Sequence, residues 1–430
     1  MLNAFLIALV LAGPGSTTSG PSIGRSSGVN SKLPVFEFAD ATGSGMGTAC
    51  ACAAVTDRDG NAMTFSRTSV ATCMKGSTFS NIQNGDLITC AAGTPRVMYG
   101  GRTSADPYLG LLIERAKTNI ALGSEEFENA VWTKTNSVVA APTVTANQAI
   151  APDNTLTADR VQFAASTGAQ YSVITQTTGT GAFAGSVFIR GNGTSGSFDL
   201  DCHNGSADSC TTCSYVDSSW TRCSCTATAG TPLFIFGNYS AGCSVARDAA
   251  DVFVWGGQIE ASGALFVSSY MKTTTAATFV RARDFATFPL ALQGGFPWSM
   301  AATWVSPTAI TGDPFIIEVA ISGGSTNRYD LWANFTAGDG ITSLNVVGGV
   351  SNNGPHRLAT AGTVIRASTF YDLTSQSTCV NDSCAATGRI YVPFSPDIIV
   401  IGGFNNGTGD EADGVVKRVC FDNRGSARCR

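Results

Sequence analysis

The sequence carries little charge: Asp, Glu, Lys and Arg make up 13% of its 430 residues, where about 25% is usual. It has no basic run and its net charge is −5, so no stripe of cations is available to a nucleic-acid backbone. Its two histidines, His203 and His356, leave little room for a His-rich metal centre or a His-activated nucleophile. No apolar run reaches the ~20 residues of a membrane-spanning helix. We therefore expect neither a nucleic-acid partner nor a membrane span.

What the chain does contain points to β-structure. Hydrophobic residues make up 43% of it, enough to bury a large core, so the scarcity of charge does not indicate disorder. Short alternating runs are separated by Gly and Asn at intervals of roughly 8–12 residues, as is typical of β-sandwiches. We predict an all-β protein with tandem β-sandwich modules, and a short helix capped by Ser124. The clearest predicted strands are residues 35–38, 62–65, 138–144, 169–176, 185–190, 233–236, 299–305, 315–320, 328–333, 343–347 and 397–402.

The longest apolar run, Ala4 to Ala12, lies near the amino terminus. It resembles the core of a secretory signal, but the usual positive residues before it are missing. The other interpretation is an uncleaved anchor that buries its apolar face in a partner protein, and the missing positive charge slightly favours it. Residues 13–31 are rich in Gly and Ser and are predicted to be a tether. Residues 1–31 are thus expected to be an anchor or signal-like segment followed by a tether.

The 14 cysteines fall into three groups separated by long cysteine-free stretches. Each group has an even number, which favours separately cross-linked modules and an oxidising environment. All 14 are therefore disulfide candidates. The groups are Cys50, Cys52, Cys73 and Cys90; then Cys202, Cys210, Cys213, Cys223, Cys225 and Cys243; then Cys379, Cys384, Cys420 and Cys429.

Zinc is the alternative for the middle group, because Cys210, Cys213, Cys223 and Cys225 place four thiols within sixteen residues. However, Cys223 and Cys225 flank one residue of a predicted strand, so both side chains point to the same face. Two cysteines on one face suit a pair of bridges to a neighbouring strand. Disulfides are favoured over zinc, and free buried thiols are the remaining possibility.

Several segments resemble the spike and fibre proteins of phages and prophages, including the head spikes of gene transfer agents. The order and spacing of these segments are more specific than any one of them. They are residues 62–67 (AMTFSR), 110–114 (GLLIE) with Thr118-Asn119, Ser124-Glu125 to Lys134, 152–160, 255–260 (WGGQIE), 296–299 (FPWS) and 399–403 (IVIGG).

The resemblance implies jelly-roll and concanavalin A-like (laminin G-like) carbohydrate-binding modules on a virion surface. With the cysteine groups, it divides the chain into the anchor and tether (1–31), a β-rich base (32–110), a jelly-roll sandwich (111–285) and a concanavalin A-like sandwich (286–430). It implies a structural, non-catalytic protein that attaches to host cell-surface polysaccharide. Its N-terminus would bind other virion proteins, and it would form a homo-oligomer. The alternative is a secreted or surface-attached bacterial adhesin with the same modules.

Glycan binding needs an exposed aromatic platform with a few polar side chains. Trp255, Trp298 and Trp304 are predicted to be core residues. Trp332 has polar neighbours and, with Tyr329, is the candidate platform. The loop of residues 405–414 supplies two further candidates, Asn405 and Asn406.

The same loop gathers oxygen ligands of the kind that calcium prefers. We name Asp410, Glu411 and Asp413 as candidate calcium ligands, and no other cofactor is expected. The second alternative function is glycan cleavage by a pair of carboxylates, for which Glu114 and Glu260 are the candidates. An ion pair or turn-fixing hydrogen bonds is the favoured explanation of those two residues.

Overall fold

The computed structural model describes residues 35–37, 62–74, 82–99, 108–177, 179, 181–203, 205, 208–228, 233–261, 266–290, 298–307, 313–322, 324, 326–334, 340–371, 374–388, 396–403 and 412–422. The predicted anchor and tether lie outside these residues. The described residues are almost entirely β-strand, which confirms the all-β fold class, and contain one short helix, α1 (Ser240–Cys243). Among the residues described, no helix is long and apolar enough to cross a membrane.

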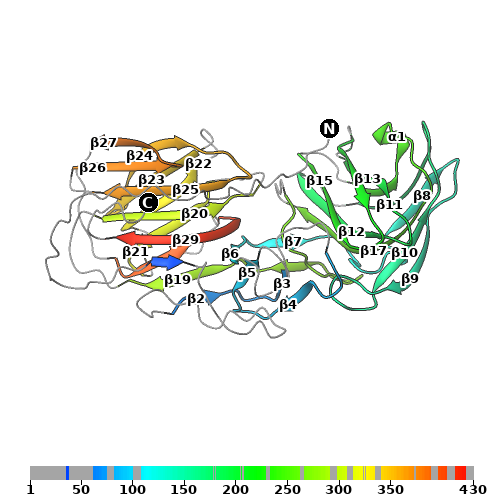
Figure 1. The fold of residues 1–430 in the computed structure, drawn as a ribbon, viewed down its shortest axis with the longest axis horizontal. Helices are drawn as coiled ribbons and strands as arrows, with labels where there is room; N and C mark the ends of the chain where they lie inside the picture. The colour runs from blue at the N-terminus through cyan, green and yellow to red at the C-terminus, as the bar shows by residue number, and fades with distance from the viewer. Residues whose placement is uncertain are drawn as a thin grey trace, which may run out of the picture. The chain divides into compact units, whose positions relative to one another are not determined.

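Two sheets pack face to face in the first sandwich, which we call the inserted sandwich (Figure 1). The first sheet, the β12 sheet, contains β15 (Thr221–Ala227), β12 (Phe183–Gly191), β17 (Ala250–Ala261), β10 (Ala158–Phe163) and β9 (Thr143–Ala149). Its β7 (Lys117–Asn119) pairs with β17, and β18 (Phe279–Arg281) pairs with β7. The second, the β16 sheet, contains β14 (Cys210–Tyr215), β13 (Gly196–His203), β16 (Leu233–Asn238), β11 (Tyr171–Thr177) and β8 (Thr133–Ser137).

The second sandwich, which we call the terminal sandwich, also has two facing sheets. The β20 sheet contains β27 (Ser383–Gly388), β26 (Ser375–Val380), β25 (Val364–Tyr371), β20 (Trp298–Val305), β29 (Gly414–Asp422), β6 (Tyr108–Ile113) and β5 (Arg96–Tyr99), and β1 (Val35–Glu37) pairs with β29. The β21 sheet contains β2 (Thr64–Ser66), β19 (Phe285–Pro289), β28 (Ile398–Ile401), β21 (Phe315–Ala320), β22 (Arg328–Asn334), β23 (Gly340–Val347) and β24 (Val350–Leu358).

The described residues of the range 32–110 do not form the separate base region that the sequence predicts. Instead, β1, β2, β5 and β6 pair with strands of the terminal sandwich, as the blue β2 beside the yellow-green β19 shows (Figure 1). The inserted sandwich therefore interrupts the terminal one between β6 and β19. Of the described strands in this range, β3 (Ala71–Met74) and β4 (Leu87–Cys90) form a hairpin of their own. The reason is pairing between residues far apart in sequence, which local alternation does not reveal.

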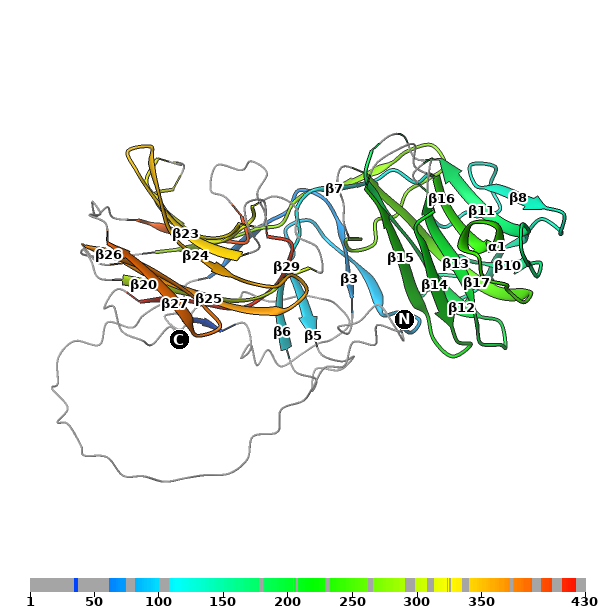
Figure 2. The same ribbon diagram turned by 90° about the horizontal axis from the view of Figure 1, so that it is seen from above.

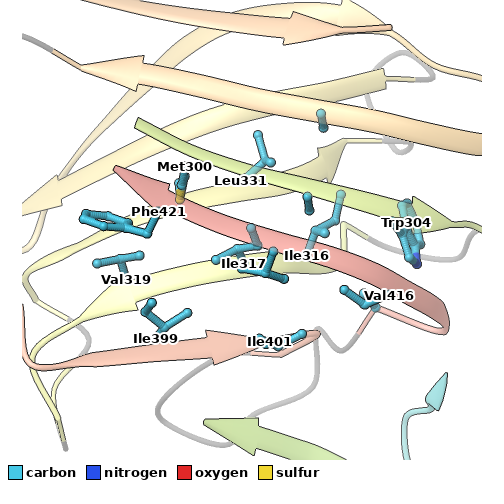
Figure 3. Packing of buried hydrophobic residues seen from close by; sticks show 14 of the residues in the cluster. Met300, Trp304, Ile316, Ile317, Val319, Leu331, Ile399, Ile401, Val416 and Phe421 are labelled. Atoms are coloured by element: carbon cyan, nitrogen blue, oxygen red, sulfur yellow. The ribbon is translucent and has the colours of Figure 1, made fainter. Parts of the chain in front are cut away.

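The core of the terminal sandwich is built from alternate side chains of its two sheets. In β25 and β26, buried positions alternate with less buried ones, as expected for strands with one face on the core. Figure 3 shows Met300, Trp304 and Phe421 of the β20 sheet packed against Ile317 and Ile399 of the β21 sheet. Trp304 is 1% exposed, which confirms it as a core residue.

The β12 sheet of the inserted sandwich is covered by hydrophobic clusters on both of its faces. Its inner core is aromatic, and Phe236 contacts Phe127, Trp132 and Phe163 at 5.4–6.3 Å between ring centroids. On the outer face, the predicted core residue Trp255 lies with Phe188, Tyr270 and Trp220 in a second cluster beneath Met74, Ile82 and Leu87 of the β3–β4 region. This hairpin therefore covers the aromatic outer face of the sheet.

Turn chemistry fixes two hairpins of the terminal sandwich. Asn381 and Asp382 both have positive φ and join β26 to β27, and Gly348 and Gly349 do the same between β23 and β24. Two-residue loops with positive φ at both positions match the twist of antiparallel strands. These residue types adopt such φ values at low cost.

Two local predictions are wrong. A strand is expected at residues 138–144, but residues 138–142 form none, because Val138 has positive φ. The strand begins at Thr143, as β9. Ser124 caps no helix, since turns follow it and its hydroxyl group bonds the hydroxyl of Tyr270 at 3.0 Å. The helix that the described residues contain, α1, begins at Ser240, where the sequence pattern predicts none.

Candidate functional site

The predicted aromatic platform in the terminal sandwich is mostly enclosed. Tyr329 is 1% exposed and its ring lies 5.1 Å from that of Tyr371 in the core, so it is not an exposed platform and this prediction is corrected. Trp332 is half-buried and stacks on Phe315 at 6.0 Å. Its indole nitrogen is buried and has no hydrogen-bond partner among the described residues. The other two glycan candidates, Asn405 and Asn406, lie outside the described residues.

The predicted calcium loop is described only at its end. Asp410 and Glu411 lie outside the described residues, whereas Asp413 is 1% exposed. The carboxylate of Asp413 forms an ion pair with Arg115 and accepts a hydrogen bond from the Arg115 backbone N–H at 2.9 Å. Asp413 therefore has a different role from the predicted one: it holds the segment that follows β6.

Five disulfides are present among the described cysteines, and each joins two members of one predicted group. The prediction of grouped disulfides is confirmed for them, and the zinc alternative is wrong because all four of its thiols are bridged. Cys420 is disulfide-bonded as well, whereas Cys50, Cys52 and Cys429 lie outside the described residues. The bridges are Cys73–Cys90, Cys202–Cys225, Cys210–Cys243, Cys213–Cys223 and Cys379–Cys384.

The two bridges from β15 connect the sheets of the inserted sandwich. Cys223 and Cys225 do share one face, as predicted, but that face is the inner one. Their partners Cys213 and Cys202 lie on β14 and β13 of the opposite sheet, and not on a neighbouring strand. The third bridge, Cys210–Cys243, ties α1 to the start of β14.

The two candidate catalytic carboxylates are buried and engaged. Glu114 is 5% exposed and accepts hydrogen bonds from Arg96 at 2.5 Å and from the Ser269 hydroxyl at 2.7 Å, and it also pairs with Arg281. Burial raises its pKa, but Arg281 and Arg96 outweigh this effect, so the pKa lies well below its usual range. Glu260 is 0% exposed and accepts hydrogen bonds from Gln258 and Ser268. These contacts support the ion-pair and turn-fixing explanation.

Glu114 belongs to a group of buried charges at the boundary of the inserted sandwich, which we call the junction cluster. It comprises Arg67, Arg96, Glu114, Arg281 and Asp284. Glu114 follows β6 and Asp284 precedes β19, so the cluster closes the two chain segments through which the inserted sandwich joins the terminal one. Its geometry gives it a structural role.

A different group of polar side chains lies on the outer face of the β16 sheet. Alternate residues of β13 point outward there, and they are Asp199, Asp201 and His203. The intervening Phe198, Leu200 and Cys202 point inward to the core. The α1 segment lies close to β13 and β11 in both views (Figures 1 and 2), and Arg247 beyond it donates a hydrogen bond to Asp199 at 3.0 Å.

Two tyrosines are half-buried on this face. Tyr171 begins β11 and Tyr239 follows β16, so antiparallel pairing brings them together. Their ring centroids are 6.0 Å apart and the rings meet edge to face. The Tyr239 hydroxyl lies 3.4 Å from Oδ1 of Asp208, and burial and the nearby carboxylates raise the pKa of Tyr239 to about 12.

Three titratable side chains meet beside Tyr239. His203 Nδ1 lies 2.8 Å from Asp208 Oδ1 and 4.0 Å from Asp201 Oδ2. Asp201 is 0% exposed, while Asp208 and His203 are partly exposed. Burial and the neighbouring Asp208 carboxylate raise the pKa of Asp201 to about 7, because two close carboxylates do not ionise together easily.

One signal for this site is present in the sequence. Asp199, Asp201 and His203 alternate along one strand and so share a face, which polar residues seldom do in the middle of an apolar run. Asp208, Tyr171 and Tyr239 have no such signal, because the strand pairing and the Cys210–Cys243 bridge bring them to this face.

No protein-family model matches the chain, and no curated protein matches it. Among solved structures, a CBM40 module of a Ruminococcus gnavus IT-sialidase, bound to α2,3-sialyllactose, shares 11% identity, covers 31% of this chain and 78% of its own, and has a TM-score of 0.26. Domains LG4-5 of the mouse laminin α1 chain share 10% identity over 67% of this chain and 93% of theirs, with a TM-score of 0.25. The CBM22-1-CBM22-2 tandem of Paenibacillus barcinonensis Xyn10C shares 11% identity over 73% and 98%, with a TM-score of 0.22. At these values the similarity carries no inference about function.

Proposed function

We propose that this chain is a non-catalytic glycan-binding protein and that the outer face of the β16 sheet contacts the sugar. The observation that carries the proposal is the Tyr171–Tyr239 pair, with Asp208 and His203 beside it. An aromatic ring packs on the C–H groups of a sugar, and carboxylate and imidazole groups bond its hydroxyls. This pair replaces Trp332 as the first candidate platform, because Trp332 is stacked on Phe315.

The finer part of the proposal is that the protein is displayed on a virion surface and attaches the particle to host polysaccharide. It is supported by the resemblance to phage spike and fibre segments and by the two β-sandwiches in one chain. Copies assembled in an oligomer would raise the avidity of a weak single site. The alternative of a secreted bacterial adhesin is supported by the disulfides, which are typical of oxidising compartments.

The test of glycan binding uses the purified full chain on arrays of bacterial polysaccharides, followed by titration of any bound glycan. Tyr171→Ala is expected to weaken binding about tenfold, equivalent to about 1.4 kcal/mol. Tyr171→Phe keeps the ring and is expected to retain binding, since sugar C–H packing needs only the aromatic face. Equal binding by the alanine variant would remove the β16-sheet face from the proposal, and no binding to any polysaccharide would remove glycan attachment itself.

The enzyme alternative and the two display alternatives have separate tests. Glu114 and Glu260 are buried in hydrogen bonds, so no release of reducing ends from a bound polysaccharide is expected. Antibodies against the chain are expected to label particles if it is a virion protein. If it is an adhesin, they would label culture supernatant or cell surfaces instead.

A further inference from the structure

Asp201, His203 and Asp208 each offer one possible ligand atom, and the three atoms are close enough to bind the same metal ion. All three donors lie within 4.8 Å of one another. A zinc ion with bonds of about 2.0–2.1 Å spaces its tetrahedral ligands about 3.3 Å apart. The two distances from His203 Nδ1, 2.8 Å to Asp208 and 4.0 Å to Asp201, lie on either side of that value.

One carboxylate oxygen of this cluster is buried without a hydrogen-bond partner among the described residues. Asp201 is fully buried, and its Oδ1 accepts a hydrogen bond from the Ser209 N–H at 2.6 Å. Its Oδ2 has no hydrogen-bond partner among the described residues and is the oxygen that faces His203. An unpaired buried carboxylate oxygen costs free energy, and a cation would remove that cost.

We propose that Asp201, His203 and Asp208 form a binding site for a divalent metal ion of the Zn²⁺ type. The donor set selects the metal: Ca²⁺ and Mg²⁺ are bound by oxygen, whereas an imidazole nitrogen suits zinc and its neighbours. Three protein ligands leave a fourth position, which faces the partly exposed side of the cluster formed by His203 and Asp208.

The scaffold holds these ligands in place without the metal. Asp201 and His203 are two residues apart on β13, whose pairing with β16 fixes their common face. Asp208 is kept near them by the Tyr239 hydroxyl and by the Cys210–Cys243 bridge two residues later. The site shares His203 and Asp208 with the proposed glycan-binding face, but it does not require glycan binding, and its test uses the metal ion alone.

The chain offers a matched control, because it has only two histidines. His356 lies on β24 of the terminal sandwich, far from β13 in the strand order. The experiment titrates ZnCl₂ into the chelator-treated full chain by calorimetry, with His203→Ala, His356→Ala and Asp201→Asn alongside, and follows the two imidazole signals by NMR. One zinc per chain is expected for the wild type and His356→Ala, with the affinity reduced at least tenfold in the other two variants.

Further readouts separate loss of the metal from loss of the fold. Zinc is expected to raise the thermal midpoint of the wild type and of His356→Ala but not that of His203→Ala, whose midpoint without metal should match the wild type. Zinc should shift the His203 imidazole signals and leave those of His356 unchanged. Zinc binding that survives in His203→Ala, tighter binding of Ca²⁺ than of Zn²⁺, or an unshifted His203 signal would each overturn the assignment.

Discussion

Glu114 and Asp284 are joined by two hydrogen bonds, one to the Asp284 carboxylate and one between their backbones. The N–H of Glu114 donates to Oδ2 of Asp284 at 3.0 Å, and the N–H of Asp284 donates to the carbonyl of Glu114 at 2.9 Å. Arg96 reaches both carboxylates. These contacts join the segment that leads into the inserted sandwich to the segment that leaves it. Buried charges therefore fix the point at which one sandwich interrupts the other.

Arg96→Met is expected to destabilise the protein strongly. It removes the buried cation shared by Glu114 and Asp284, and breaking a buried ion pair typically costs about 3–5 kcal/mol because a charge is left uncompensated. Urea unfolding followed by circular dichroism would measure the change. Arg366→Met is the matched control, since Arg366 pairs with Asp382 at 3.1 Å with side chains 64% and 80% exposed, and about 0–1 kcal/mol is expected there. Equal effects of the two variants would contradict a structural role for the junction cluster.

The disulfides between the sheets are expected to stabilise more than the hairpin disulfide. Cys202 and Cys225 are 23 residues apart, whereas Cys379 and Cys384 are 5 apart at facing positions of β26 and β27. In the loop-entropy account, replacing the first pair by Ala costs about 3 kcal/mol and replacing the second about 2 kcal/mol. Thermal unfolding of the two double variants would rank them. A larger loss from the hairpin pair would show that loop entropy does not set the order.

Local patterning was enough to predict the fold class and a number of its strands. Alternation in β25 and β26, for example, follows from one face being buried, and that signal lies within a few residues. It could not predict that β2 pairs with β19, more than 200 residues later, because register across such a separation is set by tertiary packing. The predicted base region 32–110 therefore differs from the observed pairing.

The candidate site was less predictable for a related reason. The polar neighbours of Trp332 in sequence predict an exposed platform there, with Tyr329 beside it. Tyr329 points to the core, since it is on the inward face of β22, and Trp332 has an aromatic neighbour in Phe315 of the adjacent strand. The tyrosines of the β16 sheet lie 68 positions apart in the chain, so only the pairing of β11 with β16 reveals them.

Trp332→Ala is expected to affect stability more than sugar binding. The half-buried indole contacts Phe315 and the Leu344–Val346 cluster, and truncation of a large buried aromatic costs about 3–5 kcal/mol when its burial is complete. For this partly exposed residue we expect about 2–3 kcal/mol. Chemical denaturation together with glycan titration would measure both effects. A loss of glycan affinity without a loss of stability would restore Trp332 as the platform.

Asp330 is expected to make the terminal sandwich less stable as the pH rises. It is fully buried, and burial raises its pKa from 3.8 to about 7, although Arg328 at 2.9 Å opposes the shift. Glu318, directly opposite on β21, is a second carboxylate facing Arg328. Because the folded pKa is above the unfolded one, the stabilisation is complete below about pH 4 and is lost as the pH passes 7.

Asp330→Asn removes this titration while keeping the shape of the side chain. The gap between 3.8 and about 7 corresponds to about 4 kcal/mol, at ~1.4 kcal/mol per pH unit. Between pH 4.5 and pH 8, the free energy of unfolding should therefore fall by up to this amount more in the wild type than in the variant. Asp382→Asn, at a position where the side chain is 80% exposed, should leave the wild-type profile unchanged. Parallel profiles for wild type and Asp330→Asn would mean that Asp330 is ionised in the folded protein throughout this range, with Arg328 and not a proton balancing its charge.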